Sequence, residues 1–287
     1  MKNTAAKQQI PLHLPDRKVR VGRIRYINVA PVYFGLDNGM RPPWVKLVNE
    51  PPAVLNRMLE RGELDISPVS SVAYARNHKK WLLLPNNSIS CFGEVMSVLL
   101  ASKFPFDQLN GKTVLLTEES ASAAGLLKLL FSKKNVHPVF REAQIKNPGD
   151  VQEADAALII GDRALSGLWT EHFPFVMDLG ATWKDFTGLP FVFAVWAVRK
   201  NFARDFPDAV EAVAELFRIS RENGQKHLDQ ISCKSAKHLG FSPEFCNRYY
   251  THIKYDLDYP EKMGLECFLY AMYKEKMLPG KVRLTFI

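Results

Sequence analysis

Two short loops rich in hydroxyl side chains have the residue types needed to bind an anionic ligand. Each follows an apolar stretch and precedes a helical pattern, where free N–H groups and the helix dipole favour an anion. Serine there is also a common N-cap, and for either loop alone capping is the stronger explanation. Two such loops facing one cleft favour a carboxylate site. The residues assigned to it are Ser70, Ser71, Thr117, Ser120, Ala121 and Ser122.

The segment 19–36 supplies a further candidate contact. Apolar and polar residues alternate from Val19, which predicts a half-buried strand. Pro31 lacks a backbone donor and restricts the residue before it, so the strand ends in a shaped loop that contains Tyr26 and Asn28. Ligands of open α/β sheets lie beyond the carboxyl ends of strands, and the Asn28 amide can both donate and accept. Capping of the next helix is the alternative role for Asn28.

Two more polar residues lie at positions where a ligand could contact them. Ser97 is a lone hydroxyl within an apolar strand, and it needs a hydrogen-bond partner if it is buried. Asp162 follows another apolar strand, where it could contact a ligand or cap a helix. His137 and His252 are the two histidines that we retain as candidate bases.

Composition places the chain among globular proteins and excludes several classes. Its 287 residues are 47% hydrophobic and 24% charged, and the net charge of +8 comes from scattered basic residues without interleaved aromatics. We therefore expect no nucleic-acid partner. The four cysteines do not have the spacing of a zinc site, and the sequence has no nucleotide-binding or metal-peptidase motif. We therefore expect no metal and no cofactor. No apolar stretch is long enough for a signal or a membrane span, so we expect a cytoplasmic protein.

Strands and helices alternate along the chain, which predicts a mostly parallel α/β fold. After a flexible extension over residues 1–18, we expect lobe 1 over 19–101, lobe 2 over 102–194 and a mainly helical completion of lobe 1 over 195–287. Two crossing strands, near Val98 and Ala194, would form a hinge beside a central cleft. The expected strands begin at Val19 and continue at 44–49, 64–69, 81–84, 95–101, 113–117, 136–140, 156–160 and 191–198. The expected helices are 32–37, 51–62, 70–77, 122–133 and 148–153. From residue 202 onward we expect helices and no further strand.

Four segments, read in order, resemble the chorismate dehydratases of the futalosine route to menaquinone. They are RYINVAPVYFGL (25–36), DISPVSS (65–71), TEESAS (117–122) and YPEKMGLE (259–266). The resemblance runs from about Val19 to the end and implies a type II periplasmic-binding-protein fold. It also implies conversion of chorismate to 3-[(1-carboxyvinyl)oxy]benzoate without metal or organic cofactor.

The same resemblance implies roles for the candidate residues. Asn28 and Ser97 would hold the substrate and stabilise developing charge as catalytic residues, while the two serine loops would bind its carboxylates. We add Tyr26, Pro31 and Asp162 to the expected substrate-binding residues because of their places at the ends of strands. The enolpyruvyl carboxylate of the substrate would take the ring proton, which is catalysis by orientation. The second loop reads Ser-Ala-Ser-Ala where a further hydroxyl is expected in relatives, which leaves its carboxylate contacts open.

Two alternatives remain at this point. A non-catalytic solute-binding protein for a small carboxylate would share the fold, although such proteins are normally exported. The sister enzyme that forms 1,4-dihydroxy-6-naphthoate would also share it, but its family has a Ser-Pro-x-Pro-Asn-Asp type loop and a histidine base. The loop here is Tyr-Ile-Asn-Val-Ala-Pro, which favours the dehydratase, and His137 keeps the sister enzyme open. The sequence predicts no oligomeric state.

Overall fold

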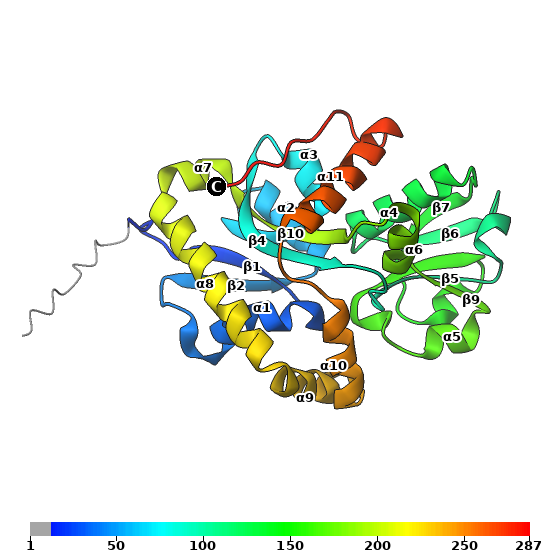
Figure 1. Cartoon of the computed structure of the whole chain (residues 1–287), viewed down its shortest axis with the longest axis horizontal. Helices are drawn as coiled ribbons and strands as arrows, with labels where there is room; N and C mark the ends of the chain where they lie inside the picture. Colours follow the sequence, from blue (N-terminus) through cyan, green and yellow to red (C-terminus); the bar gives the residue numbers. More distant parts are fainter. Residues whose placement is uncertain (1–12) are drawn as a thin grey trace, which may run out of the picture.

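The computed structural model describes residues 13–287, which form two lobes that lie side by side (Figure 1). Each lobe contains one five-stranded sheet with helices packed against it, which confirms the predicted two-lobe α/β fold. The first sheet has the order β2-β1-β3-β10-β4 and the second the order β7-β6-β8-β5-β9. Residues 1–12 of the predicted extension lie outside the described residues. No helix within 13–287 has the length and apolar character of a membrane span.

The bounds of the elements are as follows. The first sheet contains β1 (Val19–Ile24), β2 (Val45–Glu50), β3 (Ile66–Ser70), β4 (Trp81–Cys91) and β10 (Phe191–Arg199). The second contains β5 (Val98–Ser102), β6 (Thr113–Thr117), β7 (Val139–Ala143), β8 (Ala156–Ile160) and β9 (Phe175–Asp178). The helices are α1 (Ala30–Gly35), α2 (Pro52–Glu60), α3 (Ser71–Asn77), α4 (Ala121–Lys133), α5 (Leu168–His172), α6 (Leu179–Thr187), α7 (Lys200–Asp205), α8 (Pro207–Lys226), α9 (Leu228–Leu239), α10 (Pro243–His252) and α11 (Tyr259–Lys274). Short helical turns are η1 (Ile27–Val29), η2 (Leu36–Met40), η3 (Phe106–Gln108), η4 (Pro148–Val151) and η5 (Gly161–Arg163).

One antiparallel strand in the interior of each sheet marks where the chain changes lobes. β5 runs antiparallel to β8 and β9, and β10 runs antiparallel to β3 and β4, so both sheets are mixed. β10 is almost entirely apolar and buried, as expected of a strand covered on both faces. The chain passes from the first sheet to the second within 92–97, between β4 and β5, and returns within 179–190, between β9 and β10.

Several elements differ from the prediction in length or starting point, and three were not predicted. β4 extends to Cys91 because its Pro85-Asn86-Asn87 segment, which reads as a turn, is absorbed by irregular pairing with β10 and a positive φ of 55° at Asn86. The strands expected at 95–101 and 136–140 begin at residues 98 and 139. Two helices and one strand, α5, α6 and β9, were not predicted from the sequence. The part after residue 202 is not purely helical, since Lys254 and Phe286 form isolated β-bridges to two residues of β4, Ser90 and Leu83 respectively.

Candidate functional site

A small cavity lies between the lobes, where the carboxyl ends of β1, β3 and β8 meet β5 and β10. Its volume is about 60 Å³ and its wall is mainly apolar, with Ile24, Ile89, Val98, Ile160 and Phe193 among the lining residues. The structure brings five of the predicted site residues to this wall. They are Tyr26, Asn28, Ser70, Ser97 and Ser120.

Asn28 contributes an unsatisfied polar atom at the cavity wall. Its Oδ1 is buried and has no hydrogen-bond partner within residues 13–287. The residue lies in η1, and neither η1 nor α1 has a side-chain N-cap, so the capping role is not observed. A buried carbonyl without a donor costs about 1–3 kcal/mol. A ligand hydroxyl or amine in the cavity would remove that cost.

Ser97 is held in place by a tyrosine that the sequence analysis missed. Tyr249 of α10 donates from its hydroxyl to Ser97 Oγ over 3.0 Å, and both side chains are buried. Burial raises the pKa of Tyr249, so it remains a neutral donor. Ser97 Oγ accepts this bond and keeps its own proton to donate. In the sequence, Tyr249 is indistinguishable from a core aromatic on an amphipathic helix.

The segment before Ser97 is fixed from the second lobe. Asp178, at the N-terminus of α6, accepts from the backbone N–H groups of Val95 and Met96 at 3.0 and 2.7 Å. It also caps α6 through Gly180 N–H at 2.8 Å. One carboxylate therefore links α6 of lobe 2 to the segment that carries Ser97, immediately before β5.

Replacing Ser97 with alanine is expected to lower turnover about tenfold to a hundredfold, because it removes a donor at the cavity wall. Tyr249→Phe keeps the Ser97 hydroxyl but removes the hydrogen bond that positions it, so we expect a smaller loss of turnover. Ser102→Ala is the matched control, because Ser102 ends the strand β5 that begins directly after Ser97 and its hydroxyl donates to Phe104 O at 2.7 Å. Steady-state kinetics of the three variants test this order, and equal losses in Ser97→Ala and Ser102→Ala would contradict it.

Ser70 and Ser120 cap helices and also lie at the cavity wall. Their hydroxyl oxygens cap α3 and α4 by accepting from Ala73 N–H at 3.1 Å and Ala123 N–H at 3.2 Å. Both residues also line the cavity. The N-termini of α3 and α4, one from each lobe, consequently meet at the same wall.

The other residues of the two loops have their side chains engaged elsewhere. Ser71 Oγ donates to Val192 O at 2.6 Å, and Ser122 Oγ accepts from Val72 N–H at 3.2 Å across the lobe boundary. Neither Ser71 nor Ser122 lines the cavity. Thr117 and Ala121 line a larger neighbouring groove instead.

Tyr26 and Asp162 connect the loop that carries Asn28 to the second lobe. The Tyr26 hydroxyl donates to Glu119, and its ring covers Gly161 so closely that a Cβ there would lie 2.8 Å from the ring. Asp162 Oδ1 accepts from Ile27 N–H at 3.1 Å. Asp162 therefore positions the backbone next to Asn28. Pro31 lies apart from the cavity.

Pro31 packs against α8 at a point where only glycine fits. A Cβ on Gly224 would lie 2.0 Å from Pro31 O, so the two helices approach through backbone atoms. The proline thus shapes the loop and its packing, and its side chain does not line the cavity.

Asp162 is expected to make stability depend on pH. Burial raises its pKa to about 6. Ionisation therefore costs folding free energy, and this cost grows as the pH rises from about 4 to about 6 and then stays constant. Asp162→Asn should raise the melting temperature at pH 8 and have little effect at pH 4. Calorimetry at both pH values tests this, with the exposed Asp185→Asn as control. A stabilisation that is equal at both pH values would contradict the assignment.

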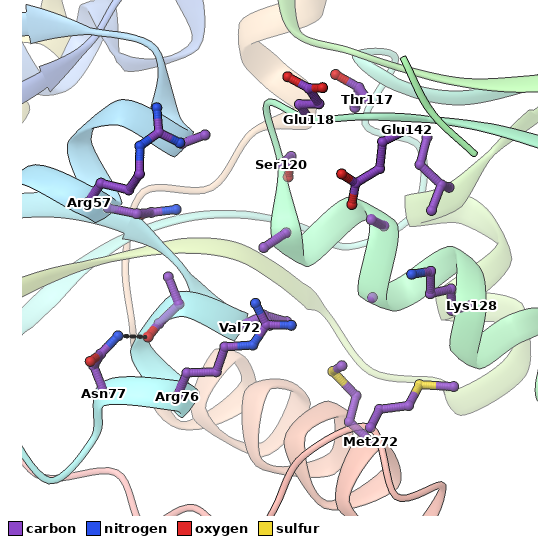
Figure 2. A pocket seen from close by; sticks show the side chains of 18 of the residues that line it. Arg57, Val72, Arg76, Asn77, Thr117, Glu118, Ser120, Lys128, Glu142 and Met272 are labelled. Carbon is purple, nitrogen blue, oxygen red and sulfur yellow. Dashed lines mark hydrogen bonds between the residues drawn. The ribbon is translucent and has the colours of Figure 1, made fainter. Parts of the chain in front are cut away.

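A larger groove of about 720 Å³ adjoins the cavity and shares Ser120 with it (Figure 2). Arg57 and Arg76 line it from α2 and α3, and Lys128 and Glu142 from lobe 2. Within the described part of the chain, none of these four side chains forms an ion pair.

The two candidate histidine bases lie elsewhere. His137 precedes β7 at the amino end of the second sheet, and its ring nitrogen contacts Asn135 at 3.1 Å. His252 contacts Glu94 O at 3.2 Å. Neither lines the cavity. Residues 13–287 also contain no group of three His, Cys, Asp or Glu side chains that could hold a metal ion.

Comparisons with known proteins agree with this architecture. A chorismate dehydratase from Thermus thermophilus is 34% identical over 88% of this chain and 94% of its own length. A 1,4-dihydroxy-6-naphtoate synthase from the same organism is 26% identical over 70% and 73%. The periplasmic aliphatic sulphonate binding protein of Escherichia coli has the same fold, with a TM-score of 0.64, 14% identity and coverage of 93% and 96%. A family model described as menaquinone biosynthesis matches residues 19–274, which include both lobes and the cavity, and the chain belongs to this menaquinone biosynthesis family.

Proposed function

We propose that this protein is a chorismate dehydratase, a hydro-lyase that converts chorismate to 3-[(1-carboxyvinyl)oxy]benzoate. The observation that carries the proposal is the identity to a chorismate dehydratase across both lobes. The cavity supports it, because the two helix N-termini at Ser70 and Ser120 suit the two carboxylates of this substrate. The reaction belongs to menaquinone biosynthesis, and we place it in the cytoplasm.

The reaction removes two groups from the ring: the proton on the carbon that bears the enol ether, and the hydroxyl on the adjacent carbon. Formation of the aromatic ring drives it. Asn28 Oδ1, which has no protein donor, would accept from the substrate and orient it. Ser97, held by Tyr249, would donate a hydrogen bond to the departing hydroxyl, and the proton removed from the ring carbon would leave with that hydroxyl as water. We assign the ring proton to the enolpyruvyl carboxylate of the substrate, since the histidines lie away from the cavity.

Purified protein incubated with chorismate tests the proposal. We expect the ultraviolet spectrum to change to that of a substituted benzoate and the product mass to fall by one water molecule. Unchanged chorismate together with tight binding of another carboxylate would instead identify a solute-binding protein. The naphthoate-forming alternative gains no support from His137, because this side chain lies at the opposite end of the second sheet from the cavity.

A further inference from the structure

Basic side chains from distant parts of the sequence surround a second hollow in lobe 1. Its volume is about 330 Å³. The charged residues that line it are Glu60, Arg61, Lys79, Lys80, Arg199 and Lys200. They lie at the edge where β3 and β4 begin and β10 ends, whereas Ser70 and the cavity lie at the opposite end of β3. The hollow is therefore separate from the proposed active site.

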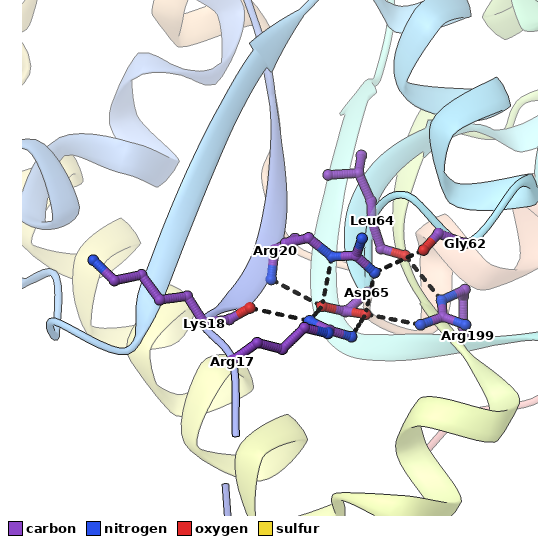
Figure 3. Close-up of polar contacts among 7 residues, drawn as sticks. All are labelled: Arg17, Lys18, Arg20, Gly62, Leu64, Asp65 and Arg199. Atoms are coloured by element: carbon purple, nitrogen blue, oxygen red, sulfur yellow. Dashed lines mark hydrogen bonds and ion pairs between the residues drawn. The ribbon is translucent and has the colours of Figure 1, made fainter. Parts of the chain in front are cut away.

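One donor at this hollow is rigidly held and unused. Arg199 Nε donates to Leu64 O at 2.9 Å, and Arg199 Nη2 donates to Asp65 at 2.8 Å, which fixes the guanidinium plane (Figure 3). Its Nη1 has no hydrogen-bond partner within residues 13–287. A Cβ placed on Gly62, which also lines the hollow, would lie 3.5 Å from this Nη1. The free donor thus lies at the wall of the hollow.

The positive charge here exceeds what the protein neutralises. Lys200 N–H donates to Lys80 O at 2.8 Å, which holds two lysine-bearing segments side by side. In the described residues, the side chains of Arg61, Lys79, Lys80 and Lys200 form no ion pair. The helix dipoles at the carboxyl ends of α2 and α3 favour Arg61, Lys79 and Lys80. They do not account for Arg199 at the end of β10 or for Lys200, the first residue of α7. Like charges gathered around a hollow repel one another until an anion binds.

We propose that this hollow binds a polyphosphate anion, such as the diphosphate or triphosphate group of a nucleotide. Lysine ammonium groups are effective point-charge donors to phosphate, and a fixed arginine adds a directed N–H donor. The hollow is lined by five cationic side chains and one carboxylate, that of Glu60. This excess of positive charge favours a ligand with several negative charges over a ligand with one. The volume suits a chain of two or three phosphate groups.

Isothermal titration of the full chain with tripolyphosphate and pyrophosphate, at low salt, tests the site. We expect one site per chain and at least a tenfold loss of affinity in Lys80→Gln/Lys200→Gln. The control is Lys226→Gln/Lys237→Gln, which removes the same charge from exposed positions of α8 and α9. Affinity should fall little in the control.

Three outcomes would overturn the proposal. They are the absence of tripolyphosphate binding, an equal loss of affinity in both double variants, and an equal affinity for tripolyphosphate and for sulfate titrated in the same way. Chorismate turnover without polyphosphate should be the same in wild type and in Lys80→Gln/Lys200→Gln, because both lysines lie beyond the amino end of β3. The polyphosphate site and the proposed dehydratase activity can thus fail independently.

Discussion

Asn28→Ala is expected to lower kcat for chorismate about 100-fold or more while leaving the protein folded. The side chain presents an amide at the cavity wall, and its Oδ1 has no donor from the part of the chain that the structure describes. Removing a polar group that contacts the reacting centre typically costs about 10²–10³ in rate. Because the wild type already carries the cost of a buried unsatisfied carbonyl, the variant should not melt at a lower temperature.

Two further variants make this prediction specific. Asn28→Asp keeps the shape but replaces the amide with an anion beside the two proposed carboxylate-binding loops, so it should be at least as inactive as Asn28→Ala. Asn38→Ala is the matched control, since Asn38 is exposed and its amide donates to Phe34 O at 2.7 Å. Turnover by Asn28→Ala within threefold of wild type would show that the site assignment is wrong.

The two-lobe fold was predictable because the central strands are buried on both faces. β8 and β10 are nearly continuous apolar runs, and such runs are identifiable without knowledge of their partners. The region between η5 and β10 was not predictable in the same way. β9 is a four-residue edge strand, and α6 depends on a cap by Asp178 whose other partners, Val95 and Met96, are remote in sequence.

Local pattern located the loops of the site but could not separate their individual residues. Ser70 and Ser71 are neighbours of the same type, yet only Ser70 lines the cavity, because Val192 O on β10 accepts from Ser71. Ser122 is likewise engaged by Val72 N–H from the other lobe. Tyr249 was missed for the same reason. In each case the partner is distant in the sequence, so only the folded chain reveals it.

Asp65→Asn is expected to destabilise the protein by about 3 kcal/mol, because it removes the buried carboxylate that compensates three partly exposed guanidinium groups. Asp65 is fully buried and accepts from Arg17 at 2.6 and 2.7 Å, from Arg20 N–H at 2.9 Å and from Arg199 at 2.8 Å (Figure 3). An amide in its place presents N–H groups to guanidinium donors. Thermal unfolding should show a fall of about 2–4 °C for each kcal/mol lost.

The pH dependence of this loss identifies its electrostatic origin. The arginines hold the pKa of Asp65 well below its usual range, so its contribution to stability is present above about pH 4 and declines as the pH falls and the carboxylate is protonated. The difference in melting temperature between wild type and Asp65→Asn should therefore be largest near pH 7 and narrow at pH 3. Asp107→Asn, at an exposed aspartate of lobe 2, controls for the substitution itself. A difference of the same size at both pH values would mean that packing, and not charge, accounts for the role of Asp65.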